Sequence, residues 1–161
     1  MLIYTFMNFG AFTVIILMRR KGIPGDEIRD FNGLIFSNPT IAVLMLVFLL
    51  SLAGIPPTAG FIAKYLVFAA VIKAYMAHAS LMLLILAIAG AVAAVVALYY
   101  YFLIVKAMFT ADSETTPVQL SFPPGMTVAL AVTLGMTFWI GLFPNTPIRM
   151  AHYAASNWGV W

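Results

Sequence analysis

Four long stretches of the chain carry no charged residue, and short polar segments separate them. They are residues 1–18, 38–63, 79–105 and 125–148. At 1.5 Å per helical residue, each of them spans or nearly spans a hydrocarbon core of ~30 Å. Residues 81–98 are apolar on every face, whereas strands of a membrane β-barrel alternate apolar and polar side chains. The pattern predicts an all-α integral membrane protein, with residues 1–161 forming a single transmembrane region.

The first predicted span covers about residues 2–18 and ends at the basic residues Arg19, Arg20 and Lys21. Glycines and a proline follow, so we expect the helix to stop there. Residues 26–36 form a connector that holds most of the acidic side chains. Its apolar residues have the spacing of one face of a short helix at the membrane interface: Ile28, Phe31, Leu34 and Ile35.

The stretch from Thr40 to about Ala77 is too long for one uninterrupted crossing, because 38 helical residues extend ~57 Å. Prolines interrupt it, since they remove backbone donors and clash with the preceding turn. We expect a single crossing made of two half-helices, because residues 40–53 reach only ~21 Å and no charge holds the turn at the surface. The alternative is a hairpin of two spans. The expected break consists of Gly54, Ile55, Pro56 and Pro57.

Two further spans bring the expected total to about four transmembrane helices. The broken helix of residues 40–77 is the second of the four. The third covers about residues 80–109 and the fourth about residues 125–143, with a polar loop between them. Prolines at positions 144 and 147 end the fourth span. Residues 148–161 predict an interfacial tail, in which Trp158 and Trp161 suit the headgroup region.

Composition supports the membrane assignment. Hydrophobic residues make up 64% of the chain and charged residues only 8%, whereas about a quarter of a soluble domain is charged. The net charge of +3 comes largely from the basic cluster after the first span, which the positive-inside rule explains better than nucleic-acid binding does. The chain has no cysteine, so it offers no thiolate ligands for an iron–sulfur cluster.

The basic residues also predict an orientation. With the broken helix as one crossing, five lie on one side and two on the other; the hairpin gives six against one. Both counts place the N-terminus away from the cytoplasm. Charge alone slightly favours the hairpin, while helix length favours the broken helix. In the count for the broken helix, the two residues on one side are Lys73 and Arg149, and the five on the other side are Arg19, Arg20, Lys21, Arg29 and Lys106.

Lys64 is the most informative residue. It lies ten residues after Gly54 and nine before Lys73, which is ~14 Å from the nearer helix end and too far for easy snorkelling. Intramembrane cations cost about 2.5 to 3.5 kcal/mol and are candidates for ion pathways. A lysine can also exchange a proton, which suits a relay. The simpler interpretation is that Lys64 neutralises a partner or lies nearer an interface.

The break and the third span offer further candidates. Gly54, Pro56, Pro57 and Gly60 predict an unwound segment of the kind found in transporters, although an ordinary proline kink fits the same four residues. Lys106 follows three tyrosines at positions 99–101. An aromatic belt with a snorkelling lysine explains this pattern; a hydrated proton-entry path is the sharper hypothesis. His78 and His152 are expected at the interface, without metal-ligand spacing.

Four segments carry a resemblance to a known family: residues 4–12, 30–34, 49–64 and 98–106. Together they closely resemble subunit N of respiratory complex I, the antiporter-like membrane subunit of proton-pumping NADH:quinone oxidoreductase, called subunit 2 in mitochondria. The resemblance covers nearly the whole chain. Residues 51–64 are typical of the wider antiporter-like superfamily, and Lys64 followed by Tyr65 distinguishes subunit N from its sisters L and M. Family members are about three times longer and contain two inverted repeats, so the chain matches a partial repeat.

The resemblance implies a role for Lys64 in a chain of buried lysines and a glutamate that carries protons across the membrane. This chain would hold no redox centre. NADH, FMN, iron–sulfur clusters and quinone would belong to partner subunits, and its own partners would be other complex I membrane subunits, including antiporter-like neighbours, and lipid. A bacterial inner membrane is the expected location.

Other functions also fit the residues. A cation/proton antiporter or a membrane-bound hydrogenase contains subunits with the same Gly-Ile-Pro-Pro pattern. An inactive or structural membrane fragment is the remaining alternative, because the other central lysines and the glutamate of the family are missing from this chain.

Overall fold

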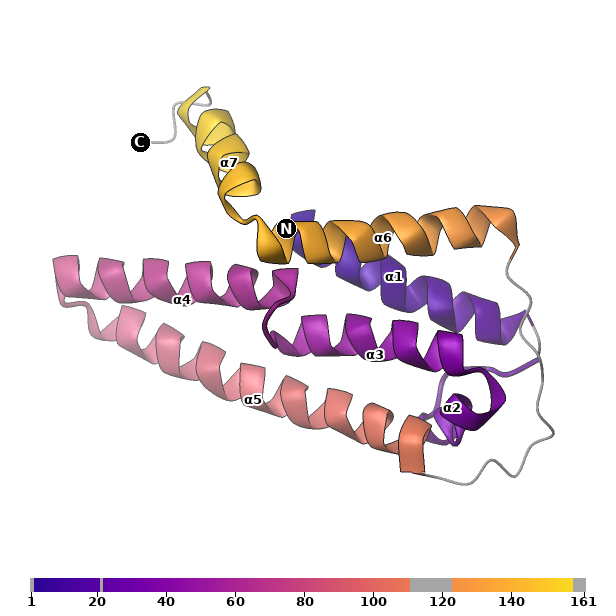
Figure 1. Cartoon of the computed structure of the whole chain (residues 1–161). Helices are drawn as coiled ribbons and strands as arrows, with labels where there is room; N and C mark the ends of the chain where they lie inside the picture. The colour runs from indigo at the N-terminus through magenta and orange to yellow at the C-terminus, as the bar shows by residue number, and fades with distance from the viewer. Residues whose placement is uncertain (1, 21, 111–122, 158–161) are drawn as a thin grey trace.

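The computed structural model describes residues 2–20, 22–110 and 123–157, and every regular element in these ranges is helical. Figure 1 shows long helices that run alongside one another. The all-α fold predicted from the hydrophobic pattern is confirmed. The elements are α1 (Leu2–Arg19), η1 (Ile28–Phe31), α2 (Leu34–Ser37), α3 (Pro39–Ala53), α4 (Ala59–His78), α5 (Leu81–Thr110), α6 (Pro124–Leu142) and α7 (Asn145–Asn157).

The membrane-spanning potential of these helices agrees with the predicted spans. In the described part of the chain, α4, α5 and α6 are long and apolar enough to cross a membrane, and α1 and α3 are apolar but shorter. Helices α1, α5 and α6 begin and end within one or two residues of the predicted boundaries. The chain is therefore an integral membrane protein of the predicted architecture.

The helix break lies where the prolines predict it. α3 ends at Ala53 and α4 begins at Ala59, so residues 54–58 are not helical. α4 continues in the direction of α3, and α5 runs antiparallel alongside both of them (Figure 1). The 15 residues of α3 and the 20 residues of α4 extend ~22 Å and ~30 Å. A hairpin would place the two helices antiparallel, and the structure does not have this arrangement.

The connector between α1 and α3 differs from the prediction of one short helix. It forms two separate helical turns, η1 and α2, because Gly33 between them takes the left-handed conformation, with φ of +64°. The N–H group of Gly33 donates a hydrogen bond of 3.1 Å to the carbonyl oxygen of Ala107 in α5. Phe31 and Leu34 are buried, as their apolar spacing predicts. The connector is thus fastened to the end of α5.

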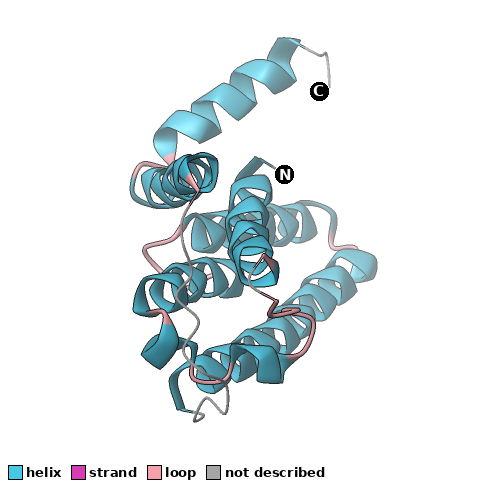
Figure 2. Cartoon of the chain, turned by 90° about the vertical axis from the view of Figure 1, so that its right-hand side faces the viewer, coloured by secondary structure: helices cyan, strands magenta, loops and turns pink. Residues whose placement is uncertain are grey.

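The C-terminal region also differs in detail. α7 begins at Asn145, three residues before the predicted tail, and Pro147 lies in its first turn, where proline is tolerated. Figure 2, which looks along the bundle, shows α7 standing away from the other helices, next to the C-terminus. The predicted interfacial residues Trp158 and Trp161 lie outside the described residues.

The buried core lies at one end of the bundle. It is formed by α1, α3, part of α6 and the last turns of α5, with the connector beneath them. By contrast, α4 buries only Ala59 and Gly60, and α5 only Ile104 and Met108. The outer faces of α4 and α5 are apolar and open, as expected for surfaces that meet lipid or other membrane helices.

The single crossing formed by α3 and α4 predicts that Ser37 and Ser80 lie on opposite sides of the membrane. Ser37→Cys and Ser80→Cys are nearly isosteric changes, and the chain has no cysteine of its own. A membrane-impermeant maleimide should label one variant only in right-side-out vesicles and the other only in inside-out vesicles. Labelling of both variants from the same side would contradict the single crossing.

Candidate functional site at the helix break

Lys64 lies in the second turn of α4, but its ammonium group reaches back to the helix break. Its Nζ donates a hydrogen bond of 2.6 Å to the carbonyl oxygen of Ala53, the last residue of α3. The side chain passes over Gly54, where an added Cβ would lie 2.8 Å from the Cδ of Lys64. The cation therefore sits at the junction of the two half-helices, ~22 Å from the start of α3.

The end of α3 leaves the Ala53 carbonyl available to Lys64. Gly54 has φ of +88°, a conformation that glycine adopts without the steric cost of a Cβ. The N–H of Ile55 donates to the carbonyl of Leu50 at 3.0 Å, and that of Gly54 donates to the carbonyl of Ser51 at 2.9 Å. These two bonds form a Schellman motif. The carbonyl end of a helix carries a partial negative charge, so it stabilises a cation placed there.

Gly60 brings the start of α4 against the end of α3. A Cβ at this position would lie 1.7 Å from the carbonyl oxygen of Ser51, a distance that no real side chain can take. The hydroxyl of Ser51 is buried, donates a hydrogen bond to the Sδ of Met7 at 2.7 Å, and accepts one from the N–H of Gly60 at 3.4 Å. Ser51 thus joins α1, α3 and α4 next to the ammonium group.

Helix α6 covers one side of the break through Gly141. A Cβ at Gly141 would lie 2.2 Å from the carbonyl oxygen of Pro57. The break is only partly covered, because Ile55, Pro56 and Pro57 are exposed.

The backbone donors of the break are nevertheless satisfied. The two prolines have no N–H group, and the N–H of Gly54 and of Ile55 are bonded to α3. The N–H of Thr58 donates to the carbonyl of Ile55 at 3.2 Å, and the Thr58 hydroxyl donates to the same carbonyl at 2.7 Å. Unwound backbone with paired donors can therefore persist inside a membrane.

A pocket of about 400 Å³ lies beside Lys64, between α1, α4 and α5. Tyr4, Phe68, Gly90 and Tyr101 are among the residues that line it. One water molecule takes about 30 Å³ of liquid volume, so the pocket has room for several. We call it the inner pocket. Lys64, Tyr4 and Tyr101 supply its polar side chains, and the other lining residues are apolar or glycine.

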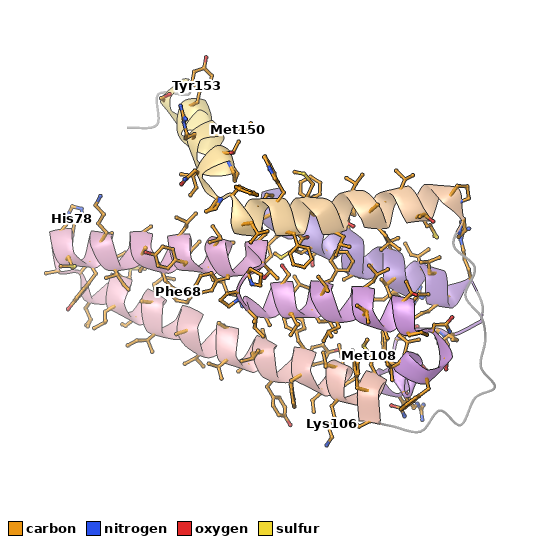
Figure 3. All side chains as sticks on the ribbon, viewed as in Figure 1. Phe68, His78, Lys106, Met108, Met150 and Tyr153 are labelled. Atoms are coloured by element: carbon orange, nitrogen blue, oxygen red, sulfur yellow. The ribbon has the colours of Figure 1, made fainter. Side chains whose placement is uncertain are left out.

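The second predicted site residue lies elsewhere. Lys106 is exposed near the end of α5 and points away from the bundle (Figure 3), and it does not line the inner pocket. Tyr99 and Tyr100 are exposed, whereas Tyr101 is partly buried and meets the Tyr100 ring edge-on, with centroids 6.3 Å apart. Of this tyrosine and lysine cluster, only Tyr101 reaches the pocket of Lys64.

The two histidines lie in helices α4 and α7. His78 is the last residue of α4 and is exposed at the end of that helix (Figure 3), as its interfacial assignment predicts. His152 belongs to α7. In the described ranges, no three histidine, aspartate or glutamate side chains come together in a way that could hold a metal ion.

The sequence pattern did not predict the groups that bind the Lys64 ammonium. A backbone carbonyl such as that of Ala53 leaves no signal in the residue pattern. Ser51 and Gly141 did carry a signal, because small residues in apolar helices indicate close helix packing. Their partners across the bundle become visible only in the folded chain.

A discontinuous membrane helix with a basic residue at its break is an arrangement of ion-translocating membrane proteins. The sequence model of the NADH:quinone oxidoreductase/Mrp antiporter transmembrane family matches residues 1–89. This match covers more than half of the chain, which therefore belongs to that family.

Individual relatives identify a particular subunit within this family. NADH-quinone oxidoreductase subunit N 2 of Solibacter usitatus is 47% identical over 150 residues, which cover 93% of this chain and 29% of the relative. Subunit N 1 of Koribacter versatilis is 43% identical over 153 residues, covering 94% and 28%. The solved structure of respiratory complex I from Thermus thermophilus with bound aureothin matches with a TM-score of 0.56 and 28% identity, covering 84% of this chain and 32% of that chain.

These findings confirm the resemblance to subunit N. The chain spans about three-tenths of the length of the curated relatives it matches. The similarity therefore concerns one part of a larger membrane subunit.

Close packing at the break predicts different effects for two glycines of α6. Gly141→Ala should destabilise the protein by about 1–3 kcal/mol, because the new methyl group overlaps the Pro57 carbonyl. Gly135→Ala is the matched control, since a Cβ there meets nothing within 4 Å. Thermal unfolding of the detergent-solubilised protein checks this difference. An equal unfolding temperature for the two variants would show that α6 does not press against the break.

Proposed function

We propose that this chain is part of the proton-translocating membrane subunit of an NADH:quinone oxidoreductase, and that Lys64 is a proton relay residue. The position of the Lys64 ammonium carries the proposal. It bonds to the free carbonyl end of a half-helix and faces a pocket large enough for water. A protonated amine is stabilised there, and a neutral amine can take up a proton from the pocket.

Lysine is suited to this role because its amine can lose its proton, whereas an arginine guanidinium effectively cannot. Carrying one charge across ~100 mV requires about 2.3 kcal/mol, so a relay needs a group that binds and releases its proton in different states. A change in the distance between Nζ and the Ala53 carbonyl would change how strongly the proton is held. Movement at the break therefore couples a conformational change to proton binding and release by Lys64.

The energy for translocation would come from partner subunits. NADH, FMN, iron–sulfur clusters and quinone would be bound there, while this chain itself carries no redox centre. Its neighbours would be other membrane subunits of the complex, including antiporter-like ones. The bacterial relatives support location in a bacterial inner membrane.

The charge distribution supports an orientation with the N-terminus away from the cytoplasm. Arg19 and Arg20 lie at the end of α1, Arg29 lies in η1 and Lys106 lies near the end of α5. Lys73 lies near the end of α4, and Arg149 belongs to α7. The connector and the end of α5 are at one end of the bundle, and the end of α4 is at the other (Figure 1). The positive-inside rule assigns the connector end to the cytoplasm.

A cation/proton antiporter subunit is the second candidate, because the matching family description includes Mrp antiporters. The subunit N relatives favour the first candidate. Proton transport that depends on added sodium, measured in vesicles without NADH, would support the antiporter instead.

In the assembled complex, Lys64→Ala and Lys64→Arg should each lower NADH-driven proton translocation by about tenfold or more, since positioned proton-transfer groups contribute at least this much. Arginine is the sharper probe, because it preserves the charge but does not deprotonate. Acidification of reconstituted vesicles, followed by a pH-sensitive dye, gives the measurement.

Lys73→Arg is the matched control in the same helix, since Lys73 is exposed near the end of α4. It should translocate protons like the unmodified complex, and native gels should show full assembly of all three variants. Wild-type translocation by Lys64→Arg would show that charge alone suffices and that Lys64 is not a titrating relay.

Lys106→Ala should lower translocation less than Lys64→Ala does. Lys106 is exposed, so water can replace its ammonium group in any proton-entry path. The same vesicle assay compares the two variants at equal complex content. An equal and complete loss in both would assign Lys106 an essential role.

A further inference from the structure

A second pocket, of about 310 Å³, lies between the connector and the inner pocket. Gly25, Asp26 and Glu27 of the connector line one part of it, and Asn8 of α1 and Tyr100 of α5 line another. Both carboxylates are exposed and form ion pairs, Asp26 with Arg19 and Glu27 with Arg29. We call this the outer pocket. Its lining thus includes exposed charged residues of the connector.

The two pockets meet at Leu52 and Tyr101, because these residues line both of them. Leu52 is buried one residue before Ala53, whose carbonyl binds the Lys64 ammonium. Tyr101 comes from the facing helix α5 and is partly buried. An apolar side chain and a phenol are therefore shared by the pocket that the connector lines and the pocket that Lys64 lines.

These two side chains differ in what they can do with a proton. A leucine side chain excludes water and offers no hydrogen bond. A tyrosine hydroxyl can donate one hydrogen bond and accept another at the same time, so it can link water on its two sides. Tyr101 is thus the only one of the two shared residues through which a proton can pass.

We propose that Tyr101 connects the outer and inner pockets and forms, with Leu52 as an apolar barrier, a proton path from the connector side to Lys64. The path rests on the proposed relay role of Lys64. It supplies Lys64 directly from connector-side water, in addition to any supply from buried groups of other helices. It also replaces Lys106 as the entry residue, since Lys106 lines neither pocket.

The transfer balances without a further reactant. The oxygen of the Tyr101 hydroxyl accepts a proton from water in the outer pocket while its own proton passes to water in the inner pocket. That water protonates the neutral amine of Lys64, which becomes an ammonium group. Tyr101 remains neutral, and rotation of its O–H group restores the starting state.

Tyr101→Phe in the assembled complex tests the path, because it removes the hydroxyl and keeps the ring. NADH-driven proton translocation should fall several-fold. Tyr99→Phe is the matched control in the same helix, since Tyr99 is exposed and lines neither pocket, and it should translocate like the unmodified complex. Equal translocation by the two variants would overturn the role of Tyr101.

Cysteine labelling tests the path without depending on proton pumping. In a Lys64→Cys variant, a small charged thiol reagent added on the connector side should label position 64. Adding Leu52→Phe enlarges the barrier and should slow this labelling several-fold, while Leu66→Phe, an exposed position in α4, should not. Labelling only from the opposite side, or at the same rate with Leu52→Phe, would overturn the path.

The two sets of variants separate this inference from the proposed function. Loss of translocation in Lys64→Arg together with normal translocation in Tyr101→Phe contradicts the path alone. Normal translocation in Lys64→Arg contradicts the relay role of Lys64. It also contradicts the proposed proton path, because the path then leads to no relay residue, even where labelling shows that the pockets connect.

Discussion

The helix that contains Lys64 cannot pass unbroken through Gly54, Pro56 and Pro57, and the rest of the site depends on how the broken ends are satisfied. In a membrane interior, water is not available to pair with orphaned backbone groups. The prolines contribute no N–H, and the Schellman motif uses the donors of Gly54 and Ile55. The carbonyl of Ala53 at the end of α3 remains as an acceptor, and the lysine of the following half-helix donates a hydrogen bond to it. The same prolines that break the helix therefore create the place where the cation is held.

Close approach of backbones fixes the geometry of this junction. Gly60 lets α4 start against the carbonyl of Ser51, and Gly141 lets α6 lie against the carbonyl of Pro57. A methyl group at Gly60 would push the half-helices apart, and one at Gly141 would push α6 away from the break. On the opposite side the prolines are exposed, and the faces of α4 and α5 bury few side chains. The described ranges thus contain one wall of a site whose other wall is open, in a chain that spans about three-tenths of the length of its relatives.

The sequence was sufficient for the helices, because long uncharged runs and paired prolines act locally. The break at residues 54–58, the boundaries of α5 and the burial of Phe31 and Leu34 all follow from such patterns. The connector was not predicted correctly, since a single left-handed residue, Gly33, divides an otherwise helical spacing. The sequence pattern also did not predict the direction of the Lys64 side chain. Its Cα position suggests an ammonium deeper in α4, whereas the four-carbon stem returns it to the break. Contacts such as that of Gly141 with Pro57 join residues far apart in sequence, and a single sequence does not pair them.

The kind of partner that holds Lys64 decides how readily its proton can move. In the described ranges, the aspartate and glutamate side chains that form ion pairs lie in the connector and bind Arg19 and Arg29. The hydrogen-bond partner of Lys64 is a neutral carbonyl with the partial charge of a helix end. A buried carboxylate would attract the ammonium with a full charge, and separating the pair would leave an uncompensated charge in a low-dielectric interior. A neutral carbonyl attracts the ammonium group less strongly than a carboxylate does. When the amine becomes neutral, it can still donate a hydrogen bond to the same carbonyl oxygen. The site therefore tolerates both protonation states of Lys64, which a relay requires and a permanent structural ion pair does not.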